Sequence, residues 1–279
     1  MYIDLTQLDE LIYIYQGMKL LVQGDDYGFT KGVTYGILDA IQNGVLRNTG
    51  LFTNMPEAVE AVELIKKYPY VCLGIDFNIV SGRPVSDPKE VPHLVDQNGE
   101  FIRSSVRTHD ERWKTEEGRA ELFPYEEVYK EMRAQYNRFI ELTGKKPGYL
   151  HAHSLTPETY EKALRTIGVE EDLHYSHDLQ DKYKMFNFRK LAFKAPKVFD
   201  PVSQLNKTPL KDFMSHSEEA LNSEYVLLTG HPGFVDAELL GLTTLSLERV
   251  RDHEMDTSSE LKKWIEDNGV ELITYSDLN

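Results

Sequence analysis

Residues 19–28 read Lys-Leu-Leu-Val-Gln-Gly-Asp-Asp-Tyr-Gly, a short apolar run followed by two acidic residues between glycines. The run 19–23 has the length and composition of a buried strand. A helix is predicted from Lys31 to Asn43, and Gly44 marks its end. A strand, a polar turn and a helix in this order are typical of the start of an α/β fold.

The same alternation continues along the chain. Further strands are predicted at 50–53, 71–79, 148–152, 224–229 and 270–274. Helices are predicted after Pro56, Pro124 and Pro157, and near 246–253 and 258–268. Strands that alternate with helices over short connections predict a parallel sheet with helices outside, either an open doubly wound sheet or a barrel.

The chain of 279 residues is expected to form one domain with elaborated loops, because α/β barrels routinely use that much sequence for a single core. We place the domain at 18–279 and an N-terminal extension, with roughly helix-spaced leucines, at 1–17. The stretch 80–123 is long and weakly periodic, so it predicts a functional loop or lid. Residues 172–215 are expected to be irregular.

The composition and the net charge restrict the classes of partner that the protein is expected to bind. The formal net charge is −15 and 41% of the residues are hydrophobic. A strongly acidic protein is disfavoured as a ligand of nucleic acid or anionic membranes, because phosphate-rich partners need a basic surface. The single cysteine, Cys72, lies in an apolar run and is expected to be buried. With an acidic N-terminus and no apolar run of membrane-spanning length, a cytoplasmic protein is expected.

Polar side chains stand at or near the carboxyl ends of four predicted strands, the edge where parallel α/β folds place ligands and catalytic groups. They are Asp25 and Asp26, Asp76, His151 and His153, and His231. Adjacent carboxylates repel each other, so a bound metal that offsets the repulsion is the simplest interpretation of Asp25 and Asp26. The alternative is that one of them caps the following helix.

The histidines differ in how strongly they indicate a metal site. His151 and His153 point to one face of a strand end, which suits a metal, although such a pair also occurs by chance. His231 precedes a Pro-Gly turn, where a hydrogen-bonded loop histidine is the alternative. The remaining histidines have no partner at ligand spacing and are expected to be surface or structural residues: His93, His109, His174, His177, His216 and His253.

The order of short motifs resembles the YdjC-like family of carbohydrate deacetylases, which includes the chitooligosaccharide deacetylases. The resemblance runs from about Met18 to Leu278. The motifs that carry it are 21–28, Asn54-Met55-Pro56, 73–78, Gly82-Arg83-Pro84-Val85, 91–95, 146–153, 230–236, Glu248-Arg249-Val250 and 275–278.

This resemblance implies an incomplete or distorted (β/α) barrel, a divalent metal ion (Zn or Mg/Mn) and removal of the N-acetyl group from an amino sugar, often by a homodimer. By position, Asp25 matches the catalytic base and Asp26 a carboxylate ligand. His153 matches a histidine ligand, and His231 a general acid. Tyr27, Trp113 and Phe234 are candidates to stack on sugar rings, with ordinary packing as the alternative.

Two positions depart from the family pattern. Asp76 stands where the family has a histidine ligand, and His151 stands where it has an aspartate. If their strands are neighbours, the two residues exchange roles and the site keeps its charge and its imidazoles. The alternatives are a carbohydrate-binding pseudoenzyme with an altered metal site, and a metal hydrolase acting on another amide or on a phosphoester.

Overall fold

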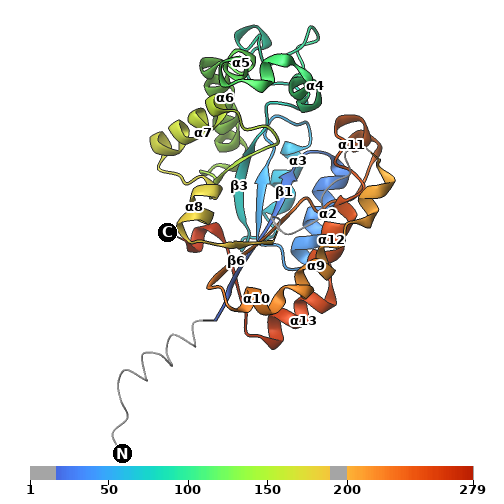
Figure 1. Cartoon of the computed structure of the whole chain (residues 1–279). Helices are drawn as coiled ribbons and strands as arrows, with labels where there is room; N and C mark the ends of the chain where they lie inside the picture. The colour runs from blue at the N-terminus through green and yellow to red at the C-terminus, as the bar shows by residue number, and fades with distance from the viewer. Residues whose placement is uncertain (1–16, 189–199, 279) are drawn as a thin grey trace, which may run out of the picture.

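A computed structural model of the chain describes residues 17–188 and 200–278 (Figure 1). Its centre is a parallel sheet in the order β4-β3-β2-β1-β6-β5, with β7 also paired to β1. The strands are β1 (Lys19–Tyr27), β2 (Asn48–Leu51), β3 (Cys72–Phe77), β4 (Leu150–Ala152), β5 (Phe186–Asn187), β6 (Tyr225–Gly230) and β7 (Glu271–Ile273).

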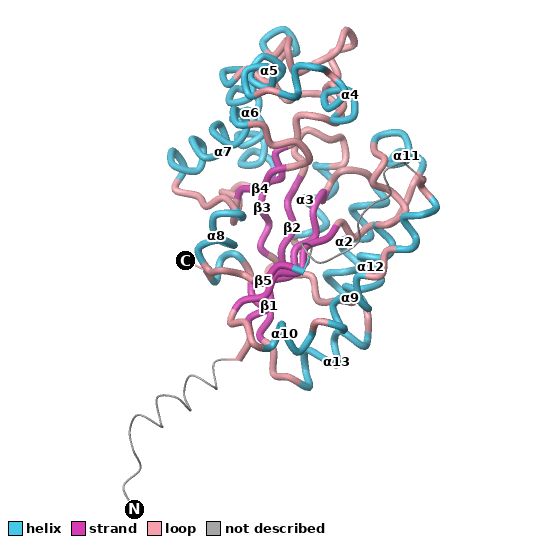
Figure 2. The backbone as a smooth tube through the Cα atoms, in the orientation of Figure 1, coloured by secondary structure: helices cyan, strands magenta, loops and turns pink. Residues whose placement is uncertain are grey.

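The sheet curls into a half-barrel with helices on its outside, which confirms the predicted incomplete barrel and the single domain (Figure 2). The two edge strands, β4 and β5, do not pair with each other. An isolated bridge from Leu150 to Tyr175 extends the β4 edge toward the next helix. The predicted extension at 1–17 falls almost entirely outside the described residues, and its boundary with the domain stays a prediction.

The helices include α2 (Lys31–Gln42), α3 (Ala58–Ile65), α4 (Ser104–His109), α5 (Glu116–Leu122), α6 (Tyr125–Thr143), α7 (Glu158–Glu171), α8 (Ser176–Lys182), α9 (Pro209–Ser215), α10 (Ser217–Leu221), α11 (Ala237–Leu242), α12 (Arg249–Thr257) and α13 (Ser259–Asp267). Thr30 caps α2 by accepting a hydrogen bond from the amide of Val33. Gly144 ends α6 with a left-handed φ of 72°, which glycine adopts without strain.

β1 is buried along almost its whole length, polar residues included. Eight of its nine residues are buried, because β1 is the central strand and both of its faces are covered. Cys72 is buried on β3, as expected. In the described part of the chain, every helix is too short or too polar to cross a lipid bilayer.

Two segments, one expected to be a functional loop or lid and the other to be irregular, contain short regular elements; the functional role of 80–123 stays a prediction. Residues 80–123 contain α4 and α5 with two short 3-10 helices, and 172–215 contain α8, β5, a 3-10 helix and α9. The helices within 104–122 and 176–215 have four to seven residues each. Elements of one or two turns are too short to show a helical period in sequence.

Candidate active site

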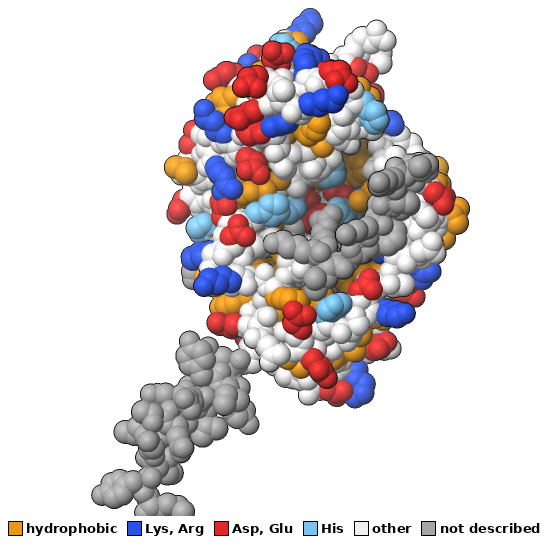
Figure 3. Space-filling model, in the orientation of Figure 1, with side chains coloured by type: hydrophobic (Ala, Val, Ile, Leu, Met, Phe, Trp, Pro, Cys, Tyr) orange, Lys and Arg blue, Asp and Glu red, His pale blue; other side chains and the backbone are white. Residues whose placement is uncertain are grey.

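A cavity of about 570 Å³ opens at the carboxyl ends of the strands. All six polar residues predicted at strand ends line it, from Asp25 to His231. Figure 3 shows histidine and acidic side chains gathered in a hollow on this face. Its rim is formed by α4 and by residues 243–245 ahead of α12. The predicted location of the site is therefore where the fold brings these side chains together.

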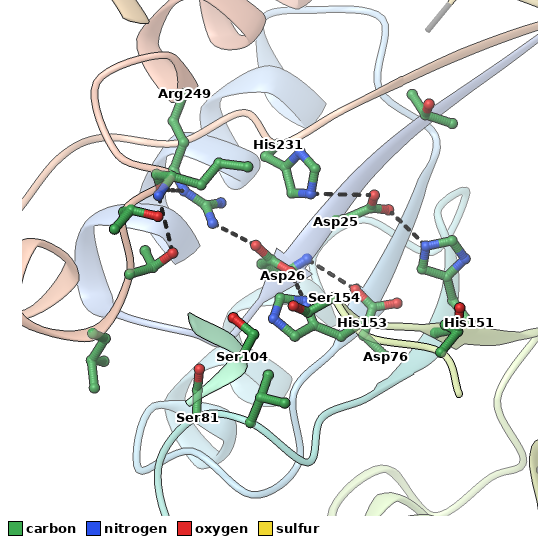
Figure 4. Close-up of a pocket in the computed structure, with 18 of the residues that line it drawn as sticks. Asp25, Asp26, Asp76, Ser81, Ser104, His151, His153, Ser154, His231 and Arg249 are labelled. Atoms are coloured by element: carbon green, nitrogen blue, oxygen red, sulfur yellow. Dashed lines mark hydrogen bonds and ion pairs between the residues drawn. The ribbon is translucent and has the colours of Figure 1, made fainter. Parts of the chain in front are cut away.

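Asp25, at the end of β1, lies between two imidazoles (Figure 4). Its Oδ1 is 3.6 Å from Nε2 of His151, and its Oδ2 is 3.8 Å from Nε2 of His231. The side-chain amide of Gln23 donates a hydrogen bond of 2.6 Å to Oδ1. The carboxylate is buried, so these neighbours replace the water that would otherwise solvate it.

Asp76 and His151 are direct cross-strand partners on β3 and β4. Asp76 is fully buried; its Oδ2 accepts a 2.9 Å hydrogen bond from the amide of Asp26, while Oδ1 has no hydrogen-bond partner within the described chain. Burial raises the pKa of Asp76 to about 7. The space for this carboxylate exists because residue 50 is glycine: a Cβ there would overlap Asp76 Oδ1.

Asp25, Asp76 and His151, which we call the buried trio, offer ligand atoms that all lie within 4.8 Å of one another. Two carboxylates and one imidazole are hard and borderline donors of the kind that divalent cations take in proteins. Oδ1 of Asp76 is buried and has no hydrogen-bond partner among the described residues, so it has a lone pair to offer to a cation. The residues present therefore fit a divalent cation.

Asp26 belongs to a different cluster. Its φ of 75° is left-handed, and the register of β1 with β2 shifts between Gly24 and Tyr27. Its Oδ1 lies 2.9 Å from Nδ1 of His153 and its Oδ2 accepts a 2.5 Å hydrogen bond from Arg249. Burial acts to raise the pKa of Asp26, but the charges of His153 and Arg249 hold it well below its usual range. Asp26 is thus ionised and neutralised by side chains.

His153 and His231 occupy the two sides of the carboxylate pair. The ring of His153 packs edge-on against Phe52 with centroids 4.7 Å apart. His231 follows β6, and its amide donates a 2.9 Å hydrogen bond to Asp252 on α12. Asp252 also pairs with Lys207 at 2.7 Å, which fixes the loop that carries His231.

The three aromatic candidates for sugar stacking lie outside this cavity. Tyr27 is fully buried and donates a hydrogen bond to the carbonyl of Ala61. Trp113 packs against Phe123, and Phe234 against His253 on another face of the molecule. The placement of all three residues fits ordinary packing. Sugar binding by these residues stays a prediction, and their position outside the cavity does not support it.

Helix α8 supplies site residues that the sequence did not reveal. His177, expected to be a surface or structural residue, lines the cavity, as does Gln180. The hydroxyl of Ser176 lies 2.6 Å from Nδ1 of His151. Serine and glutamine in a short polar segment give no signal that separates them from a solvated loop, so only the folded chain shows their role.

The amino-acid sequence of this chain is similar to those of a known protein family. Residues 19–267 match the family described as YdjC-like protein. The chain belongs to the YdjC-like family. A relative in Listeria innocua serovar 6a, named carbohydrate deacetylase 2, is 31% identical over 94% of this chain and 99% of its own length. A chitooligosaccharide deacetylase of Proteus mirabilis is 27% identical, covering 93% and 98%.

A solved structure supports the fold of this YdjC-like protein. It comes from Enterococcus faecalis V583 and is described as a candidate cellobiose-phosphate cleavage protein. The two chains are 24% identical, with a TM-score of 0.69 over 94% of this chain and 99% of the other. At that identity the likeness concerns the fold.

Proposed function

We propose that this YdjC-like protein is a metal-dependent hydrolase that removes the N-acetyl group from an amino sugar or a short chitooligosaccharide. The observation that carries the proposal is the buried trio at the base of an open polar cavity. The names of its relatives, carbohydrate deacetylase and chitooligosaccharide deacetylase, support the substrate class.

The residues proposed to hold the cation are Asp25, Asp76 and His151. When bound, a divalent cation polarises the acetamide carbonyl and lowers the pKa of a water toward about 7. The pairing of Asp76 with His151 across β3 and β4 supports the proposed exchange of roles between these positions. One imidazole with two carboxylates suits Zn²⁺ and also Mn²⁺, whereas Mg²⁺ would prefer oxygen alone.

Proton transfer is assigned to Asp25 and His231. Oδ1 of Asp25 faces His151 and the trio, whereas Oδ2 faces Nε2 of His231. Oδ2 is therefore placed to accept the proton of the attacking water. His231 as imidazolium then donates the Nε2 proton to the departing amine, which leaves acetate and a free amino sugar as products.

Asp26 and His153 are also predicted ligands, and that role stays a prediction. Their charges are engaged with each other and with Arg249. We propose that the Asp26, His153 and Arg249 cluster positions the substrate in the cavity. Its opposite charges largely cancel, so it adds little net charge to the site. If metal is lost when Asp26 is changed but not when Asp76 is changed, the ligand set is Asp26 and His153 instead.

A second candidate function is a carbohydrate-binding protein without turnover. The observation that favours it is Gln23, whose amide nitrogen contacts Asp25 Oδ1 at 2.6 Å and His151 Nε2 at 3.3 Å. One neutral side chain thereby satisfies two of the proposed ligand atoms. The same chain would then bind oligosaccharide but retain no cation.

Metal analysis of the purified protein, together with acetate release from N,N′-diacetylchitobiose, tests the proposal. We expect a near-stoichiometric divalent metal and turnover that chelation abolishes. Asp76→Asn should remove both, whereas Asp267→Asn, a control on the exposed end of α13, should remove neither. Metal-free protein that still binds the sugar would establish the binding protein and exclude the enzyme.

Two finer properties stay predictions. Cytoplasmic location rests on the composition, and a homodimer rests on the family resemblance. Light scattering on the purified chain, whose monomer mass is 32.2 kDa, measures the second directly.

A further inference from the structure

The wall of the cavity includes Ser81, in the loop that follows β3. Its backbone N–H donates a 3.1 Å hydrogen bond to Oδ1 of Asn78. Its carbonyl accepts hydrogen bonds of 2.8 and 2.9 Å from the side-chain amides of Asn78 and Asn54. Within residues 17–188 and 200–278, its hydroxyl has no hydrogen-bond partner. The main chain of Ser81 is therefore fixed, while its one polar side-chain group is free to bind a ligand in the cavity (Figure 4).

Asn78 is fully buried, and each polar atom of its side chain binds a neighbouring part of this loop. Its Oδ1 accepts hydrogen bonds from the amides of Val80 and Ser81. Its Nδ2 donates to the carbonyl of Ser81 and, at 3.0 Å, to Oδ1 of Asn54. Asn54 also donates a 3.0 Å hydrogen bond to the carbonyl of Arg83. Two asparagine side chains thus fix the backbone from 80 to 83.

Helix α6 holds this loop through two buried side chains. Gln135 pairs with the backbone of Asn78: its Oε1 accepts from the N–H at 3.1 Å, and its Nε2 donates to the carbonyl at 2.6 Å. Glu131, one turn earlier, accepts from the same Nε2 at 2.8 Å, which fixes the orientation of the amide. The carboxylate of Glu131 also accepts 2.9 Å hydrogen bonds from the amides of 85–86. The helix therefore binds the loop on both sides of Ser81.

This network is fully paired at its centre. Neither Asn78 nor Gln135 has a buried side-chain atom without a hydrogen-bond partner. Burying amides and a carboxylate costs free energy unless each group is hydrogen-bonded, and a loop packed by apolar side chains avoids that cost. A paired network gives in return one rigid conformation. The conformation that it fixes here is that of the backbone next to Ser81.

We propose that Ser81 is a substrate-binding residue, whose hydroxyl forms a hydrogen bond with a hydroxyl or with the acetamide of the bound amino sugar. Asn78, Gln135 and Glu131 are positioning residues that act through it. A serine hydroxyl both donates and accepts, which suits sugar hydroxyls, and a preformed contact loses little conformational entropy on binding. The identity of the ligand rests on the proposed function, whereas the attachment of the loop to α6 does not.

Ser81→Ala tests the contact itself. The KM for N,N′-diacetylchitobiose should rise by about 2- to 10-fold, the usual value of one neutral hydrogen bond, with little change in kcat and none in metal content. Calorimetric titration with the same sugar gives a second readout. Made in the slowly reacting His231→Ala background, it should show the same factor in Kd.

Gln135→Met tests the positioning. It should raise the KM and speed hydrogen exchange of the amides in 80–86, but it should add nothing to the KM in the Ser81→Ala background, because it acts through that hydroxyl. Asn137→Met, the same change at an exposed amide of α6, is the matched control and should have neither effect. If Gln135→Met does not fold, Asn54→Ala removes one donor to the carbonyl of Ser81 from a half-buried position and should act in the same direction.

Several outcomes would overturn the inference. They are a Ser81→Ala variant with the wild-type KM and Kd, independent effects of the two changes in the double variant, and loss of metal from Gln135→Met, which would mean that α6 positions Asp76 instead. Wild-type protein that binds the sugar without turnover would refute the proposed catalysis alone, and the Kd of Ser81→Ala would still decide the role of the hydroxyl. Wild-type protein with no affinity for the sugar would refute both.

Discussion

Replacing Arg249 by methionine should destabilise the protein strongly, because it breaks a fully buried ion pair. Arg249 and Asp26 are each 1% exposed or less. Removing one partner of such a pair costs about 3–5 kcal/mol, since the other charge stays buried and uncompensated. His153 still lies 2.9 Å from Oδ1 of Asp26 and offsets part of this, so the lower value, about 3 kcal/mol, is expected.

A loss of about 3 kcal/mol changes the folding equilibrium roughly 100-fold and lowers Tm by about 6–12 °C for a domain of this size. Denaturant unfolding followed by the fluorescence of the two tryptophans measures it, with a chelator present so that metal binding does not contribute. Adding Asp26→Asn to Arg249→Met should recover at least about 2 kcal/mol, because the orphaned charge is removed.

Arg133→Met is the control. Arg133 pairs with Glu170 and Glu171, but its side chain is 22% exposed, so its loss should cost about 1 kcal/mol or less. The reasoning is refuted if Arg249→Met costs no more than Arg133→Met, or if the double variant is no more stable than Arg249→Met alone.

Three further predictions concern other parts of the molecule. Gly50→Ala should lower divalent-metal affinity at least about 10-fold by displacing Asp76, while Gly241→Ala, where a Cβ meets nothing within 4 Å, should not; calorimetric titration compares them. Burial raises the pKa of Asp256 well above its usual value, so the native state holds a proton that the unfolded state releases. The free energy of unfolding should therefore fall as pH rises from about 4 toward that pKa, by up to about 1.4 kcal/mol per unit, and Asp256→Asn should remove this slope in denaturant titrations at several pH values. His231→Ala should lower kcat by about 10²- to 10⁴-fold with unchanged metal content, and metal loss would make it a ligand.

The sequence predicted the half-barrel because six of the seven strands of its sheet overlap predicted strands; β5, which has two residues, was not predicted. It also located the site, since Asp25, Asp76, His151 and His231 all stand near carboxyl ends of parallel strands. The residue pattern by itself could not separate the roles of Asp25 and Asp26, which only the family resemblance distinguished as base and ligand. Their division into two clusters depends on the left-handed backbone at Asp26 and on Arg249, which lies 223 positions away in the chain.

Side chains that act from a distance in sequence were missed for the same reason. Ser176 and Gln180 lie on a helix of seven residues, too short to stand out, and Tyr275 looked like any core aromatic. The contacts of Ser176 with His151, of Tyr275 with Gln23 and of Gln180 with Tyr275 arise only when α8 and the segment after β7 meet at the sheet. Aromatic character alone likewise could not distinguish a sugar platform from the packing found at Tyr27.

The unjoined edges of the sheet have a consequence for how this scaffold can change. Between β4 and β5 no hydrogen-bond ladder ties one strand to the next, and an isolated bridge from Leu150 to Tyr175 is the backbone pairing that the segment after β4 makes with it. Exchanges at His177 and Gln180, which line the cavity from α8, can thus widen or narrow it without shifting the strands that hold Asp25 and Asp76. At this gap the substrate specificity can change while Asp25, Asp76 and the other reacting side chains stay the same.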